Sequence, residues 1–271
     1  NRWLPDYALF MAIKDSLSGC SLDCWEEDLR LRRPAALEQA RERLADDVSF
    51  YQILQFFFHK QWKMLRSYAA GKGIKLIGDI PIYTSPDSAD VWSCPQLFQL
   101  NERLGPAAVA GVPPDAFSAD GQLWGNPLYD WDAMAQDGYS WWVQRMRHAF
   151  TMFDVVRIDH FRAFSAYFSI PAGAASAAEG KWIKGPGEEF FAQLQKALGR
   201  LPVIAENLGD LDDDVHDLLK ATGFPGMKVL QFAFDPDTES SYLPHNIEKD
   251  CVVYTGTHDN ETALGFAKEG D

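Results

Sequence analysis

The sequence predicts an α/β fold in which near-continuous apolar strands alternate with helices. Five segments have the composition of buried strands, and each ends in polar residues, as in "VVRIDHFRAF" (155–164), where the apolar run gives way to Arg157 and Asp159. Strands of this kind are typical of a parallel sheet that is covered by helices on both faces. Because the polar residues follow the apolar part, they should gather at the carboxyl ends of the strands, where a (β/α)₈ barrel has its catalytic face.

The composition is that of an ordinary globular protein. Of the 271 residues, 46% are hydrophobic and 24% are charged, and the formal net charge is −14. An acidic surface repels nucleic acid and anionic membranes, so we expect neither as a partner. The four cysteines form no C-x-x-C pair and no zinc pattern, which predicts reduced thiols and a cytoplasmic protein. We also expect no membrane span and no signal peptide.

The amino-terminal part is predicted to be a helical lead-in subdomain, residues 1–73. Residues 1–45 are polar and helical in pattern, and 46–73 form a strongly amphipathic helix that ends at Gly71 and Gly73. Large apolar residues recur in that helix at helical spacing: Phe50, Ile53, Leu54, Phe57, Phe58, Trp62 and Leu65.

The remainder, residues 74–271, is predicted to be a partial barrel core. The expected strands are "IKLIGDIPIY", "FDVVRIDHF", "LPVIAENLGD", "MKVLQFAFD" and "CVVYTGTHDN". Helices are expected at about 138–152, in "EEFFAQLQKALG" and in "LDDDVHDLLKATG". Residues 84–136 have no long period and are rich in Pro, Gly, Asp and Asn. They are predicted to be a long ordered loop insertion, and such loops are more often functional than idle.

Five strands are too few for a complete barrel, which has eight. The predicted fold is therefore a (β/α)₈ barrel of the TIM type, present as an incomplete central portion with the helical lead-in and the loop insertion. A doubly wound sheet is the structural alternative. That fold would carry a Gly-rich phosphate turn after its first strand, and the sequence has none there.

Acidic residues follow four of the five strands and should face one another in a barrel: Asp79, Asp159, Glu206 and Asp259. Clustered carboxylates repel, so either a metal or a division of roles must resolve the repulsion. A metal site would use His160 and His258 with the acids, but neither H-x-H nor H-E-x-x-H is present. We therefore predict no metal and no cofactor.

A division of roles between carboxylates fits the pattern better. Arg157 and Asp159 are two apart on a strand and point to the same side, so the guanidinium should lower the pKa of Asp159 and keep it ionised as a nucleophile. The apolar residues that precede Glu206 favour its protonated form. Asn207, the next residue, is placed to form a hydrogen bond with a substrate hydroxyl. This is the arrangement of a retaining glycosidase, whose carboxyl groups lie about 5–5.5 Å apart. Asp259 would bind sugar hydroxyls and support the transition state.

Several motifs resemble the amylomaltases, the 4-α-glucanotransferases of glycoside hydrolase family 77. The resemblance covers nearly the whole chain and is strongest from Gly73 to Thr262. The segment beginning at Gly111 separates this family from the α-amylases. The motifs stand in the family's order: "LIGDIPIY", "GVPPDAFSADGQLWGNPLYDW", "DVVRIDHFRAF", "IAENLG", "FPGMKVLQFAFD", "YLPHN" and "YTGTHDN".

The resemblance implies a role for each matching residue. Asp159 would be the nucleophile, Glu206 the acid/base and Asp259 the transition-state stabiliser. A supporting shell would comprise Arg157, His160 and His258. Matching positions line the glucan groove in the family: Asp79, Asp115, Gln122, Trp124, Asn126 and Asp235.

The implied function is a retaining 4-α-glucanotransferase. It would act on maltooligosaccharides and on α-1,4-glucans derived from starch or glycogen, with another glucan or glucose as the acceptor. Two alternatives stay open: an α-glucan hydrolase of the same fold, and a non-catalytic glucan-binding barrel fragment. Family members carry barrel strands before the helical region and another strand after "THDN", so the activity is expected of the full-length protein. The oligomeric state is not predicted.

Overall fold

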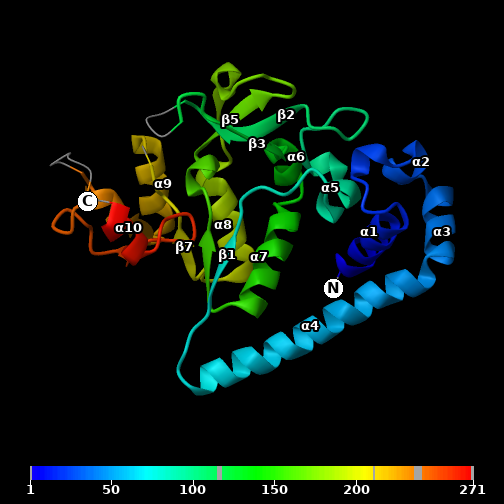
Figure 1. Ribbon diagram of the computed structural model, residues 1–271, viewed down its shortest axis with the longest axis horizontal. Coiled ribbons are helices and arrows are strands. Elements are labelled where there is room, and N and C mark those ends of the chain that lie inside the picture. The colour runs from blue at the N-terminus through cyan, green and yellow to red at the C-terminus, as the bar shows by residue number, and fades with distance from the viewer. Residues whose placement is uncertain (1, 115–117, 210, 235–239, 270–271) are drawn as a thin grey trace.

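The computed structural model describes residues 2–114, 118–209, 211–234 and 240–269 (Figure 1). Asp115 and Asp235, both predicted to line a groove, lie outside these ranges. Helices form in residues 1–73, as the sequence predicted, and they pack against α5 (Ala89–Ser93): Phe10, Trp25 and Trp92 are in mutual ring contact at 5.1–5.8 Å between centroids. The helices of this segment are α1 (Leu4–Ser16), α2 (Glu27–Arg30), α3 (Pro34–Arg43) and the long α4 (Ala45–Gly71).

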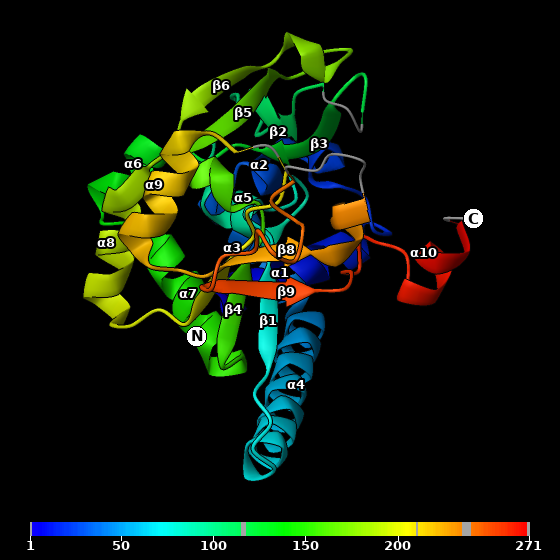
Figure 2. The same cartoon turned by 90° about the vertical axis from the view of Figure 1, so that its left-hand side faces the viewer.

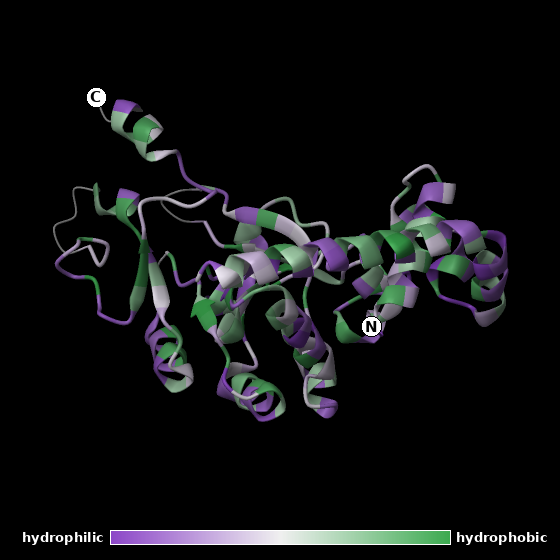
Figure 3. Cartoon of the chain, turned by 90° about the horizontal axis from the view of Figure 1, so that it is seen from below, coloured by the Kyte–Doolittle hydropathy of each residue, from purple (hydrophilic) through white to green (hydrophobic). Residues whose placement is uncertain are grey.

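Helix α4 leaves most of its large apolar side chains in solvent. The green segments of its ribbon mark hydrophobic residues along the helix (Figure 3). An amphipathic pattern ordinarily marks a face that is buried against a core. Here six of the seven residues that predicted the helix are 44–54% exposed, whereas Trp62 donates to the Met152 carbonyl at 2.8 Å. Of the helices in the described ranges, α4 included, none has both the length and the apolar character that a bilayer crossing requires.

The five predicted strand segments all form strands, in two parallel sheets. The first sheet has the order β1-β4-β7 and the second pairs β8 with β9, which lie side by side in Figure 2. A hydrogen bond of 2.9 Å from the Ala205 amide to the Pro225 carbonyl joins the two sheets. Within the described ranges these strands form an open array and do not close into a barrel. Their bounds are Ile77–Ile80, Val155–Ile158, Val203–Ala205, Gly226–Val229 and Cys251–Tyr254.

The segment predicted to be a long loop is folded, so that prediction is wrong. It contains α5 (Ala89–Ser93), β2 (Ala108–Val112), β3 (Gln122–Pro127) and α6 (Trp131–Gln136). Strands β2 and β3 join β5 (Ala166–Pro171) and β6 (Lys181–Lys184) in an antiparallel sheet of order β3-β2-β5-β6. Glycine hides the strand period: Gly111 lies so close to β3 that a Cβ would sit 2.0 Å from the Gln122 carbonyl oxygen.

Three helices line one side of the parallel strands (Figures 1 and 3). Val156 and Ile158 point into the core that these helices cover, where Trp142, Phe164 and Phe190 pack together. Arg157 alternates with them and points to the opposite side of the sheet. The fold therefore directs the predicted site residue away from the helices. The helices are α7 (Ser140–Met152), α8 (Gly187–Leu198) and α9 (Asp213–Thr222); the short α10 (Ala263–Glu269) lies apart from them.

Candidate active site

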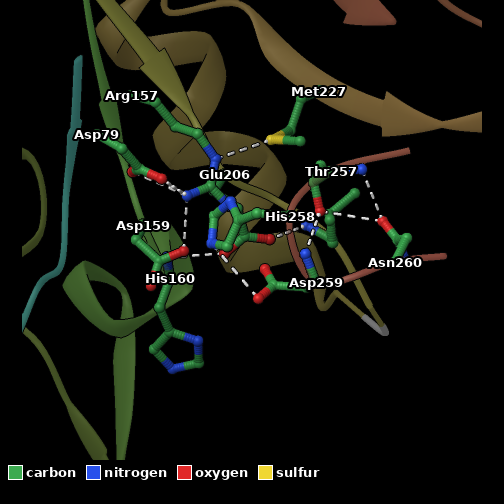
Figure 4. Close-up of polar contacts among 11 residues, drawn as sticks. Asp79, Arg157, Asp159, His160, Glu206, Met227, Thr257, His258, Asp259 and Asn260 are labelled. Atoms are coloured by element: carbon green, nitrogen blue, oxygen red, sulfur yellow. Dashed lines mark hydrogen bonds and ion pairs between the residues drawn. The ribbon is translucent and has the colours of Figure 1, made fainter. Parts of the chain in front are cut away.

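The carboxyl ends of three neighbouring strands bring the acidic residues together (Figure 4). Asp79 lies on β1 directly opposite Arg157 on β4, and Asp159 and Glu206 each follow their strand by one residue. The ladder continues past the strands, because the Asp159 amide donates to the Ile80 carbonyl and the Glu206 amide to the Ile158 carbonyl, both at 3.0 Å. The backbone thus fixes the spacing of the carboxyl groups.

Arg157 is the centre of the polar contacts. Its Nη1 donates to both carboxylate oxygens of Asp79 at 2.8 Å and lies 2.9 Å from Oδ1 of Asp159. Its Nε donates to the Met227 sulfur at 3.3 Å. Burial disfavours the charged guanidinium, but the hydrogen bonds and negative charge of Asp79 outweigh this and raise the pKa of Arg157. One cation therefore holds two carboxylates.

The pKa of Asp159 moves in the direction opposite to the predicted one. Removal from water raises the pKa of this carboxyl, and the charges of Asp79 and Asp259 raise it further, while Arg157 opposes the rise. The sequence identified the nearest cation, Arg157. It did not show that the carboxylates of Asp79 and Asp259 come near Asp159 or that Asp159 is removed from water. Arg157 still provides the hydrogen bond that orients the carboxylate.

Glu206 is held by backbone amides. Its Oε2 accepts from the His160 amide and its Oε1 from the Leu208 amide, both at 2.7 Å. Burial raises the pKa of Glu206, as the apolar strand predicted, and the negative charge of Asp159 adds to the effect, while the two amides oppose it. The raised pKa favours the protonated form that a general acid needs.

The backbone amide and the imidazole ring of His160 make contacts in different directions. Its left-handed conformation (φ 52°) turns the amide toward Glu206, and histidine is among the residues that tolerate this region. The imidazole points away from the carboxyl groups in Figure 4 and meets the Trp124 ring edge to face, at 4.8 Å between centroids. Burial and the nearby Arg162 lower the pKa of His160 to about 3, so the ring is neutral at physiological pH.

Strand β3 carries the three described groove residues of the insertion. Trp124 is 36% exposed, and its Nε1 donates to the Gln122 side chain at 3.0 Å. Asn126 donates to the Thr84 carbonyl at 2.8 Å and so ties β3 to the chain that follows β1. Trp124 therefore lies against the ring of the residue that directly follows Asp159 in the chain.

Asp259 and His258 lie in an exposed turn beyond β9. The turn is closed by Asn260, whose side chain accepts from the Thr257 amide at 2.9 Å. The His258 Nε2 lies 3.4 Å from the Asp259 carboxylate, and both side chains are about 70% exposed, at 71% and 69%. Figure 4 shows Asp259 next to the other carboxyl groups, and its negative charge adds to the rise in the pKa of Asp159.

Asn207 is buried, and its Oδ1 accepts from the Met227 amide at 2.8 Å. The predicted bond to a substrate hydroxyl would therefore have to come from its NH₂ group. Sequence reasoning did not identify two further residues near the site, Met227 and Tyr242. The Tyr242 hydroxyl accepts from the Gly209 amide at 3.1 Å, just beyond Glu206. Both lie in the quoted motifs, but their side chains carry no charge that would have marked them.

The described residues contain no group of three or more His, Cys, Asp or Glu side chains arranged to hold a metal ion. The positive charge of Arg157 offsets part of the repulsion between Asp79 and Asp159 instead. The fold and the site together define an α/β protein with an acidic site at the carboxyl ends of its parallel strands.

The comparisons give the family. The chain matches the 4-alpha-glucanotransferase family over residues 1–271 and belongs to it. It is 49% identical to the 4-alpha-glucanotransferase of Clostridium butyricum over 98% of this chain and 55% of the relative. The potato (Solanum tuberosum) chloroplastic/amyloplastic 4-alpha-glucanotransferase is 48% identical, over 98% of this chain and 46% of the relative.

Solved structures agree with this assignment. The amylomaltase of Streptococcus agalactiae, determined in complex with acarbose, superposes with a TM-score of 0.96 at 44% identity, covering 98% of this chain and 54% of that one. The amylomaltase of Corynebacterium glutamicum is similar in fold, with a TM-score of 0.76 at 22% identity over 98% of this chain and 35% of that one. The chain thus spans about half the length of the relatives it matches.

Proposed function

We propose that the protein to which this chain contributes is a retaining 4-α-glucanotransferase. The observation that carries the proposal is the pairing of Asp159, bonded by Arg157, with a partly buried Glu206 whose raised pKa favours the protonated form. Two carboxyl groups with different environments are what a retaining mechanism requires. The substrates follow from the family: maltooligosaccharides and other α-1,4-glucans as donors, and a glucan or glucose as acceptor. The free cysteines are compatible with the cytoplasmic location that we also propose.

The two steps of the reaction use these groups in turn. The Asp159 carboxylate attacks the anomeric carbon while Glu206 gives its proton to the glycosidic oxygen, so that the C1–O bond breaks and a glycosyl–Asp159 ester forms. Glu206, now ionised, takes the proton of the acceptor 4-hydroxyl, which displaces Asp159. Asp259 supports the positive charge that develops on the sugar ring, and Arg157 keeps the nucleophile oriented.

The open array of strands is proposed to be part of a (β/α)₈ barrel. Parallel strands are stable when both faces are covered, and here the described helices cover one side of the β1-β4-β7 sheet. The exposed apolar side chains of α4 and the edge strand β1, with Ile77 53% exposed, are the surfaces on which the remaining half of the family fold would pack. The division of the chain into a helical lead-in subdomain (1–73) and a partial barrel core (74–271) is part of the same proposal.

Maltotriose separates transfer from hydrolysis. A glucanotransferase at the length of its relatives should convert maltotriose into glucose and longer maltooligosaccharides, with the number of reducing ends unchanged. A rise in reducing ends in step with consumption would identify the hydrolase instead. Binding of maltotriose without any conversion would favour the third alternative, a non-catalytic glucan-binding protein.

A crystal structure of the protein at the length of its relatives should place the carboxyl groups of Asp159 and Glu206 about 5–5.5 Å apart, because the nucleophile and the acid then reach one bond directly. A separation near 9 Å would leave room for a water nucleophile and would identify an inverting enzyme. The stereochemistry of the first product, followed by proton NMR, provides an independent reading of the same question.

Trp124→Ala should raise the ratio of hydrolysis to transfer a few-fold, on the basis of roughly 1 kcal/mol for a stacking contact. The ring lies against the imidazole of His160, the residue that follows Asp159, and the family resemblance makes it a cover of the glucan groove, so its removal should admit water and weaken acceptor stacking. The increase in reducing ends measures hydrolysis, and the formation of longer maltooligosaccharides from maltotriose measures transfer. Trp182→Ala is the matched control, because Trp182 lies in the same antiparallel sheet and is similarly exposed at 40%. An equal ratio in both variants would make Trp124 a structural rim residue.

A further inference from the structure

We propose that Met227 is a positioning residue of the active site, whose sulfur fixes the guanidinium of Arg157 and, through it, the carboxylate of Asp159. The inference rests on the proposed function and adds a residue to its site. Met227 lies on β8, in the second parallel sheet, and carries no group that reacts with a sugar. Its role follows from its place next to the one cation that holds two carboxylates.

The contacts of Arg157 show why the sulfur matters. Nη1 serves both Asp79 and Asp159, so a rotation of the planar guanidinium about the Cδ–Nε bond would improve one contact and weaken the other. The hydrogen bond from Nε to the Met227 sulfur, at 3.3 Å, lies at the base of the group and limits that movement. Thioether sulfur is a weak acceptor, but a buried N–H left without any partner is costly.

Met227 is itself held firmly. Its side chain is fully buried with Ile204 and Val229, and its amide donates to Oδ1 of Asn207 at 2.8 Å. Position 226 is glycine because a Cβ there would lie 2.7 Å from the Asn207 side chain. Asn207 directly follows Glu206, so one continuous set of contacts runs from the acid through Asn207, Met227 and Arg157 to the nucleophile.

The ionisation of Asp159 depends on where this guanidinium lies. The groups that act on Asp159 are Arg157, which stabilises its charged form, and the carboxylates of Asp79 and Asp259, which oppose it. Glu206 faces both Arg157 and Asp159 from β7. A guanidinium that moves away from Asp159 would leave three carboxyl groups around it, so the nucleophile would ionise only at higher pH.

Met227→Leu removes the sulfur with little change in volume and tests the proposal in the protein at the length of its relatives. We expect kcat for maltotriose disproportionation to fall roughly three- to tenfold, the value of one hydrogen bond. KM should stay unchanged, and the acid limb of the pH profile of kcat/KM should move to higher pH. Met227→Gln, which restores an acceptor at a similar position, should recover part of the loss.

Met134→Leu is the matched control. Met134 is equally buried, in the helix-covered core, so the substitution makes the same chemical change at a position away from the carboxylates. It should leave the pH profile in place. If Met227→Leu and Met134→Leu behave alike, in kcat and in the acid limb, Met227 is only a packing residue and the proposal is wrong.

A readout without turnover separates this proposal from the proposed function. In protein labelled with ¹⁵N-arginine, the Nε–H signal of Arg157, assigned by its loss in Arg157→Lys, should exchange slowly with solvent. It should exchange faster and shift in Met227→Leu but not in Met134→Leu. An unchanged signal in Met227→Leu would overturn the positioning role even if the enzyme is an active transferase. A changed signal in a protein without transferase activity would refute the function while leaving the contact established.

Discussion

Asp159→Asn should reduce turnover by about 10⁴-fold or more, the scale seen when a nucleophile is removed, while maltooligosaccharide binding persists. The carboxylate attacks in the transition state and contributes little to ground-state affinity, so kcat should fall and the dissociation constant should change little. Arg157 would keep Asp79 as its partner in this variant, so the site should retain its shape. Disproportionation of maltotriose and calorimetric titration with a longer maltooligosaccharide measure the two quantities.

Asp79→Asn is the matched comparison, because it removes the same charge beside the same guanidinium but leaves the nucleophile in place. Its loss should be clearly smaller. A slow fluorinated α-glucosyl donor should also label a peptide that contains Asp159 in the parent protein and leave it unlabelled in Asp159→Asn. Comparable losses in the two variants, with the label on another residue, would remove Asp159 from the nucleophilic role.

Glu206→Gln should lower kcat on maltotriose by about 10²- to 10⁴-fold, the usual contribution of general acid catalysis. The loss should be much smaller with α-glucosyl fluoride as donor, because fluoride leaves without a proton. Equal losses on the two donors would mean that Glu206 acts by holding the backbone at His160 and Leu208 rather than by proton transfer.

The pH profile tests the same assignment. Burial raises the pKa of both Asp159 and Glu206, so the acid limb of kcat/KM, set by ionisation of the nucleophile, and the alkaline limb, set by loss of the acid's proton, should both lie above the ordinary carboxyl values. The two groups interact, and the limbs therefore report the pair. In Glu206→Gln the alkaline limb should disappear while the acid limb remains. The profile of this variant would be measured with α-glucosyl fluoride as the donor. Persistence of the alkaline limb would assign it to another group.

The sequence by itself determined the parallel strands and the positions of the key acids. Apolar runs of strand length with β-branched residues mark β4, β7 and β9 without any knowledge of their neighbours. Because such strands share a direction, Asp159 and Glu206 at their ends had to meet at one edge. The same local logic identified the main helices. It also predicted the direction of the Glu206 pKa, because an apolar approach to a carboxyl group signals burial.

Only the tertiary structure decided the features that depend on residues far apart in the chain. The pKa of Asp159 rises because water leaves and because Asp79 and Asp259 come near it, although the nearest cation in sequence, Arg157, acts in the other direction. The antiparallel sheet includes β2 and β3, two short strands whose glycines hide their period. Arg157 and Met227 lie 70 positions apart, and no local pattern relates them. Local sequence specifies backbone periodicity, whereas burial and electrostatics are sums over neighbours that only folding brings together.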